Sequence, residues 1–177
     1  MRIVAGSRKG HRIAAPKGVD TRPTSDRVRE AVFSMLGTVE GAAVLDLFAG
    51  SGAMGLEALS RGAASCTFVE RDRAAARVIG ANLEKLRLTG AVVVNGDVAR
   101  ALRDERSRGR RFDLVLVDPP YDEWDAHARD LSELLPGLLA DDALAVLETS
   151  DRVEPELPLD LVTTRRYGSA RITVFSR

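Results

Sequence analysis

Short apolar runs alternate with segments of helical periodicity along most of the chain. Five runs have the length and composition of buried strands: residues 43–48, 65–69, 91–94, 112–117 and 143–148. Four other segments carry apolar residues at helical spacing: residues 52–61, 72–86, 98–106 and 125–135. This alternation predicts an α/β fold in which helices cover both faces of a parallel sheet.

Both ends of the chain depart from the alternation. Residues 159–167 and 170–175 have strand patterns and are separated by a Gly-Ser pair, which is a hairpin signal. We therefore expect the sheet to finish in an antiparallel hairpin. Nearer the N-terminus, a cap at Thr24 or Ser25 predicts a helix that ends at Gly37.

The first residues predict a small β-hairpin. Residues 2–5 and 11–14 form two short strand patterns around a glycine-flanked turn at residues 6–10. Because an isolated hairpin is marginal in water, it should lean on the rest of the protein or on a ligand. We expect a basic hairpin arm over residues 1–20 and a single domain over residues 21–177.

Composition excludes several classes of protein. A chain of 177 residues with 45% apolar and 29% charged residues fits one ordinary globular α/β domain. The lone Cys66 excludes an internal disulfide framework and a cysteine-based metal site. No apolar run approaches the ~20 residues that cross a bilayer, and the N-terminus is too polar for a secretory signal. We expect a cytoplasmic monomer without a metal.

Charge is unevenly distributed although the formal net charge is zero. Residues 1–30 hold eight basic and three acidic side chains, and the remainder of the chain is correspondingly acidic. A basic leading segment favours an anionic partner, and a solvated basic surface is the alternative. The candidate RNA contacts in this segment are Arg2, Arg8, Lys9, Arg12, Arg22 and Arg27.

A glycine-rich loop follows the first predicted strand of the domain. Gly50 to Gly55 match the G-x-G-x-x-G pattern, and Glu70 lies about 20 residues further on, where an acid can accept hydrogen bonds from ribose hydroxyls. A nicotinamide cofactor fits this pattern. Asp46 favours S-adenosylmethionine instead, because a carboxylate suits the ammonium of the methionine moiety and repels a pyrophosphate.

A further acid supports the same cofactor. Asp97 follows the third strand and is able to accept a hydrogen bond from an adenine amino group, with a backbone contact from Val98. The structural alternatives are an N-terminal structural acid at Asp46 and a helix N-cap at Asp97. The expected cofactor-site residues are Thr24, Asp46, Phe48, Gly50, Gly52, Glu70, Arg71, Asp97, Val98 and Asp118.

The motif Asp118-Pro119-Pro120-Tyr121 ends the fourth predicted strand. Its carboxylate and carbonyls accept hydrogen bonds from an exocyclic amine, and the two prolines supply no N–H donors. Tyr121 can stack on a base. With the glycine-rich loop, the motif predicts methyl transfer to an amine, provided that Asp118 and Glu70 open onto one shared cavity. A proline turn with a packed tyrosine is the structural alternative.

These motifs resemble those of the amino-methyltransferases that act on adenine N6, guanine N2 and similar nitrogens. The leading segment Arg2 to Gly6, the stretch from Thr21 to Phe33 and the short length resemble the RsmD family, which methylates guanine N2 in 16S ribosomal RNA. The resemblance implies a Rossmann-like class I methyltransferase fold with a seven-stranded, mostly parallel sheet. It also implies S-adenosylmethionine as cofactor and the small ribosomal subunit, or its assembly intermediate, as partner.

Three alternatives remain open at this point. A DNA adenine-N6 methyltransferase and a protein glutamine methyltransferase use similar motifs, although the latter more often has Asn in place of Asp118. A non-catalytic RNA-binding module would keep the fold without turnover. Trp124 and His127 follow the motif, where packing is the expected role of Trp124.

Overall fold

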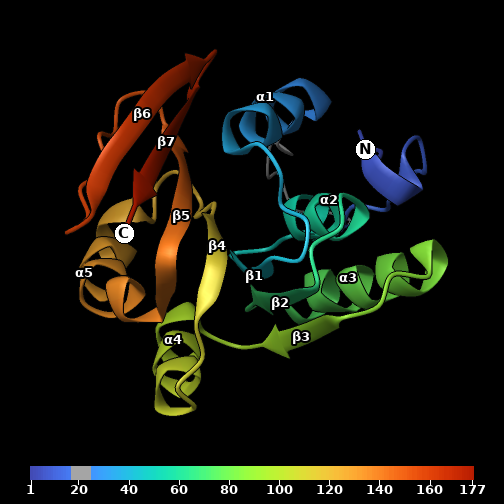
Figure 1. The fold of residues 1–177 in the computed structure, drawn as a ribbon, viewed down its shortest axis with the longest axis horizontal. Helices are drawn as coiled ribbons and strands as arrows, with labels where there is room; N and C mark the ends of the chain where they lie inside the picture. Colours follow the sequence, from blue (N-terminus) through green and yellow to red (C-terminus); the bar gives the residue numbers. More distant parts are fainter. Residues whose placement is uncertain (17–24) are drawn as a thin grey trace.

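The computed structural model describes residues 1–16 and 25–177. Its helices are α1 (Asp26–Leu36), α2 (Ala53–Ser60), α3 (Arg73–Leu86), α4 (Val98–Ser107) and α5 (Trp124–Leu134), with short 3-10 turns η1 (Gly6–Arg8) and η2 (Leu135–Leu138). Its strands are β1 (Ala43–Leu47), β2 (Ser65–Glu70), β3 (Ala91–Asn95), β4 (Phe112–Val117), β5 (Leu139–Ser150), β6 (Asp160–Tyr167) and β7 (Ala170–Ser176). Figure 1 shows their arrangement.

The strands form one seven-stranded sheet in the order β3-β2-β1-β4-β5-β7-β6. The first five strands of this order pair in parallel, and β7 pairs antiparallel with both β5 and β6. The predicted α/β fold with an antiparallel C-terminal hairpin is therefore confirmed. Chain order reverses between β1 and β4, and open α/β sheets bind their ligands at such a switch point.

Two apolar cores lie on opposite faces of this sheet. Side chains of α1, α2 and α3 pack on one face, and side chains of α4 and α5 pack on the other (Figure 1). Residues along β1 alternate between the cores, so Val44 enters the first core whereas Leu45 and Leu47 enter the second. Cys66 is buried in the first core, and burial raises the pKa of its thiol.

The N-terminal segment differs from the predicted pair of strands. It contains a single antiparallel bridge, Arg2 with Arg12, around the turn η1. Backbone bonds from Ile3 N to His11 O (2.9 Å) and from Gly10 N to Ile3 O (2.8 Å) keep a hairpin path. Ile3 and Ile13 are buried, so this hairpin packs against the body of the protein.

Element boundaries differ from the prediction by a few residues. Strand β5 begins before the expected residue 143, because its first residue Leu139 pairs with Phe112 across an irregularity in the register. Helix α5 begins at Trp124, which is 7% exposed and packs in the second core, as expected for a packing residue. Across residues 1–16 and 25–177, none of the helices combines the length and apolarity that a membrane span requires.

Candidate active site

The carboxyl ends of β1, β2 and β4 meet at one edge of the sheet. Leu47 is in register with Val69 of β2 and with Val117 of β4. The chain then continues from each strand, with Asp118 N donating to Leu47 O (3.4 Å) and Ala49 N donating to Val69 O (3.1 Å). Glu70 and Asp118 therefore lie at the same edge, on either side of β1, as the predicted arrangement requires.

The glycine-rich loop is shaped by its backbone and by one carboxylate. Gly50 and Gly52 have φ values of 54° and 78°, in the left-handed region that glycine adopts without strain. Gly52 N donates to Ala49 O (2.7 Å) and starts α2. Glu70 Oε2 accepts from Gly50 N and Glu70 Oε1 accepts from Asp72 N, each at 2.7 Å. The second-strand acid thus holds the loop as well as facing the edge.

Asp46 lies beneath this loop instead of at its mouth. The side chain is 3% exposed, and Asp46 Oδ2 accepts from Gly55 N of α2 at 2.9 Å. Burial raises the pKa of Asp46 to about 7, and the nearby negative charge of Glu70 acts in the same direction. This geometry gives Asp46 a structural role, since its carboxylate bonds β1 to α2.

The carboxyl end of β3 supplies further polar groups. Asp97 is exposed and caps α4, because its Oδ1 accepts from Arg100 N at 3.0 Å, while Val98 is buried. Asn95 was not predicted as a site residue. Its Nδ2 donates to Glu70 O (2.9 Å) and to Arg71 O (3.0 Å), which ties the end of β3 to the end of β2.

The Asp118–Tyr121 motif leaves β4 at the same edge. Pro119 is buried, whereas Asp118 and Pro120 are partly exposed. Tyr121 is 39% exposed, and its hydroxyl lies 3.4 Å from Glu148 Oε1 of β5. A partly exposed carboxylate followed by a rigid turn and an accessible ring is able to receive a flat amine-bearing group from solvent.

A side-chain cluster that includes the predicted site residues Arg71 and Phe48 bridges two of these strand ends. Arg71, after β2, forms an ion pair with Glu123, which follows the Asp118–Tyr121 motif. Glu123 Oε2 also lies 3.3 Å from His127 Nε2, and the His127 ring meets the Phe48 ring edge-on at 4.8 Å. The hydrogen bond from Arg71 holds the pKa of Glu123 below its usual range. Arg71 and Phe48 were predicted as site residues, whereas Glu123 was missed, and the signal for it in the sequence is its i, i+4 spacing from His127 at the start of a helix.

Comparison with known proteins now identifies the family. The family model described as "Conserved hypothetical protein 95" matches residues 1–176. Ribosomal RNA small subunit methyltransferase D of Escherichia coli (strain K12) is 41% identical over 161 residues, which cover 89% of this chain and 78% of that protein. The chain belongs to this RsmD family. The resemblance seen in the N-terminal segment and the motifs is therefore confirmed.

Other relatives of this RsmD family member span its whole length. YlbH of Bacillus subtilis is 41% identical over 184 residues, covering 100% of this chain and 99% of YlbH. The solved structure of TTHA0928 from Thermus thermophilus has a TM-score of 0.86 and 33% identity, with coverage of 100% of this chain and 99% of that one. The sheet and both cores described above are thus the fold of the family.

The basic residues of the RsmD N-terminal segment differ in what they contact. Arg8 donates from Nε to Leu86 O and from Nη2 to Arg87 O (3.3 Å), so its guanidinium secures the segment to the end of α3. Arg2 forms an ion pair with Asp26 (3.0 Å). Lys9, Arg12 and Arg27 are exposed. The remaining candidates Arg22 and Thr24 lie outside the described residues.

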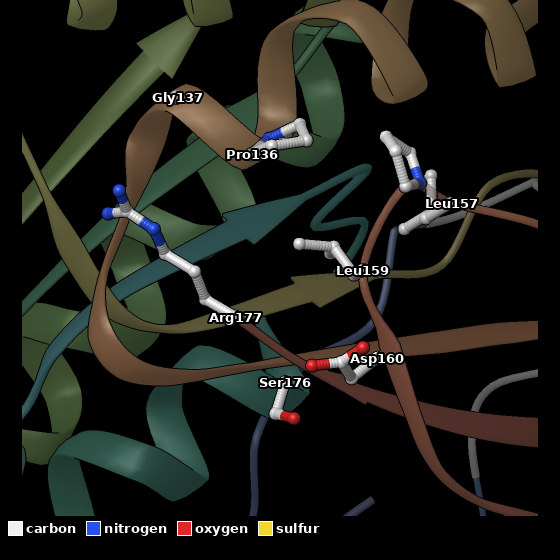
Figure 2. A pocket seen from close by; sticks show the side chains of 8 residues that line it. Pro136, Gly137, Leu157, Leu159, Asp160, Ser176 and Arg177 are labelled. Carbon is white, nitrogen blue, oxygen red and sulfur yellow. The ribbon is translucent and has the colours of Figure 1, made fainter.

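A surface pocket of about 610 Å³ lies elsewhere on the molecule (Figure 2). Its lining includes Pro136, Leu159, Asp160 and Arg177, near the start of β5, the start of β6 and the end of β7. Those strand ends are at the amino edge of the parallel sheet, opposite the glycine-rich loop. The pocket is therefore separate from the candidate active site.

Proposed function

We propose that this RsmD family protein transfers a methyl group from S-adenosylmethionine to the exocyclic N2 of a guanine in 16S ribosomal RNA. The E. coli relative carries the name of a small-subunit ribosomal RNA methyltransferase, which supports the reaction and the class of substrate. The name of this relative does not specify the acceptor atom, so guanine N2 is the more specific part of the proposal. The observation that carries the proposal is the common edge of the glycine-rich loop and Asp118, on adjacent strands.

The loop side of this edge fits S-adenosylmethionine, whose sulfonium supplies an electrophilic methyl group. The nearest atom to the position that a Cβ would take at Gly50 is Phe48 O, at 3.9 Å. The backbone at Gly50 is therefore open to a close approach. Glu70 keeps lone pairs for ribose hydroxyls beside its two backbone bonds. Asp97 faces solvent, where it can accept from an adenine amine. Asp46 contributes by holding α2 to β1 beneath the loop, and we propose that it attracts the ammonium of the methionine moiety from there.

The motif side fits the target base. Asp118 and the Pro119 carbonyl accept hydrogen bonds from the exocyclic amine, which turns the nitrogen lone pair toward the methyl group. Pro119 and Pro120 add no competing N–H donor. Tyr121 stacks on the base, a contact worth ~1–3 kcal/mol. Because a paired base cannot enter such a site, the guanine is unpaired or flipped out.

The substrate is 16S ribosomal RNA within the small subunit or its assembly intermediate. Lys9, Arg12 and Arg27 are exposed cations that suit phosphate contacts, and Arg22 belongs to the same proposal. Arg2 pairs with Asp26, and Arg8 donates to backbone carbonyls at the end of α3. Both guanidinium groups therefore have fewer N–H donors available for RNA phosphates. We further propose that the protein acts as a cytoplasmic monomer and needs no metal, because the sulfonium itself activates the methyl group.

The direct test is Asp118→Ala assayed with tritiated S-adenosylmethionine on purified small subunits. We expect kcat to fall at least ~100-fold, since the variant loses the acceptor that orients the amine. S-adenosylhomocysteine binding measured by calorimetry should change much less. The matched control is Asp122→Ala, because Asp122 is an exposed carboxylate just after the motif. It should keep full activity.

The product identifies the acceptor atom. Digestion of the methylated RNA to nucleosides and mass analysis should give N2-methylguanosine. N6-methyladenosine, or methyl incorporation into protein, would replace the proposal with one of the alternative acceptors. Full activity in Asp118→Ala would remove the proposed role of the motif, and a silent assay on every small-subunit RNA would favour a non-catalytic binding module.

A further inference from the structure

Asn82 is a buried amide in the middle of α3. It is 1% exposed and shares its helix face with the buried residues Ala75, Ile79 and Leu86. A polar side chain at such a position is costly unless its hydrogen-bonding groups are satisfied. The hydrogen-bond partners of the Asn82 amide therefore need to be identified.

The amide holds two separate segments of the chain. Asn82 Oδ1 accepts from Ala14 N (2.8 Å), while Nδ2 donates to Ala14 O (3.0 Å) and to Ser51 O (3.2 Å). Both N–H donors of the amide are used. Ala14 thus bonds the side chain through both of its backbone groups, as it would bond a neighbouring strand.

Ser51 is the central residue of the glycine-rich loop, between Gly50 and Gly52. The residues on each side are held by other elements, because Gly50 N donates to Glu70 of β2 and Gly52 packs on Ile79 of α3. The carbonyl of Ser51 is turned inward by Asn82. The peptide between Ser51 and Gly52 is thus held at both of its polar groups, with Gly52 N bonded to Ala49 O (2.7 Å) and Ser51 O bonded to Asn82 (3.2 Å).

Ala14 ends a segment that is docked along its whole described length. Glu57 of α2 is fully buried, and its carboxylate accepts from Val4 N (2.7 Å) and Ala5 N (2.9 Å). At the far end of α2, Ser60 Oγ accepts from Arg8 N (2.9 Å) and donates to Ala5 O (2.6 Å). These contacts join the segment to α2, whereas the Asn82 contact also reaches the glycine-rich loop, where Ser51 Oγ lies 4.0 Å from Met1 Sδ of the same segment.

We propose that Asn82 is a positioning residue for the cofactor: it sets the Ser51 peptide and couples the N-terminal segment to the glycine-rich loop. This inference rests on the proposed function of that loop as the S-adenosylmethionine site. It assigns the N-terminal segment a part in cofactor binding, in addition to any contact with RNA. Loss of the amide should weaken cofactor binding with little effect on the RNA substrate.

Asn82→Ala and Asn82→Asp test the proposal together. Alanine removes all three hydrogen bonds, whereas aspartate keeps the side-chain volume and the acceptor for Ala14 N but loses both donors. We expect the dissociation constant for S-adenosylhomocysteine and KM for S-adenosylmethionine to rise at least tenfold in both variants. KM for small subunits should stay within twofold of wild type.

Ser60→Ala is the matched control. It removes two buried hydrogen bonds to the N-terminal segment but none to the loop, so it should lower Tm and leave cofactor binding within twofold of wild type. Equal weakening in Ser60→Ala and Asn82→Ala would mean that docking of the segment in general matters, and would overturn the specific role of Asn82.

Hydrogen exchange of the cofactor-free protein gives a readout that is independent of activity. The amide of Gly52, which donates to Ala49 O, should exchange faster in both Asn82 variants than in Ser60→Ala. Unchanged exchange and unchanged cofactor affinity in Asn82→Asp would overturn the inference even if Asn82→Ala folds poorly. If the unaltered protein bound no S-adenosylhomocysteine, the proposed function would fail, and this inference with it.

Discussion

At the scale of single residues, Asp46 shows how strand geometry decides the environment of a side chain. Asp46 and Val44 are two residues apart on β1, so both side chains point to the same face, and Val44 belongs to the first core. The carboxyl of Asp46 follows it inward to Gly55 N. The motif alone indicated an acid at the strand end, whereas the alternation along the strand determined that the acid is buried.

A pH dependence follows from the raised pKa of Asp46, about 7 against an ordinary value of 3.8. Because the folded pKa is the higher one, the carboxyl stabilises the fold at low pH, and this contribution is lost as pH rises toward 7. Relative to Asp46→Asn, the wild-type free energy of unfolding should fall as pH rises from 5 to 7, by roughly 1 kcal/mol per pH unit and less steeply near pH 7. Urea denaturation at both pH values measures the difference, and a constant gap between the two proteins would contradict it.

At the scale of elements, most helices and strands could be predicted from the sequence, because each buries one face and carries a periodic pattern. Strand β4 has the bounds expected from its apolar run. The N-terminal hairpin could not be predicted in the same way. Side chains of Glu57 and Asn82 replace the partners that strands would provide, and no local pattern reports which distant side chain bonds a backbone group. Asn82 itself was detectable only as a polar residue in an apolar helical stripe.

The contact between α2 and β2 gives a prediction at this scale. A Cβ at Gly55 would lie 2.3 Å from the Phe68 ring and 2.7 Å from Cys66 Sγ, so Gly55→Ala pushes the helix off the sheet. We expect a loss of about 1–3 kcal/mol, because overpacking outweighs the better helix propensity of alanine.

Gly80→Ala is its matched control, since Gly80 is also within a helix and has no atom within 4 Å of the position that an added methyl group would take. It should stabilise the protein by about 0.5–1 kcal/mol. Thermal unfolding of both variants measures the two effects, and equal signs would refute the close packing of α2 on β2.

At the scale of the whole molecule, the candidate active site and the N-terminal turn were predictable to different degrees. The candidate active site lies at the carboxyl edge of β1, β2 and β4, and parallel-sheet topology made this edge predictable from the order of strands and motifs. The position of the N-terminal turn was not predictable, because it depends on contacts of Arg8 with the end of α3. Arg8 contacts Leu86 and Arg87 at the end of α3, roughly one helical turn beyond Asn82, whose amide bonds Ser51 of the glycine-rich loop.

The exposure of cations on the N-terminal segment predicts how they affect RNA binding. Lys9 and Arg12 are exposed on this segment, where they can reach phosphates of a large folded RNA. In Lys9→Ala/Arg12→Ala, KM for small subunits should rise about 3–10-fold at physiological salt, and the salt dependence of binding should weaken by roughly one to two released counterions. The value of kcat should not change, because neither residue contacts the reacting groups.

The control for this pair is Arg100→Ala/Arg129→Ala, which removes the same charge from side chains that are 83% and 87% exposed on α4 and α5. It should leave KM within twofold of wild type if binding depends on where the charge lies. A similar rise of KM in both double variants would mean that net charge alone governs association. A fall in kcat confined to Lys9→Ala/Arg12→Ala would instead mean that these residues influence the active site in addition to binding RNA.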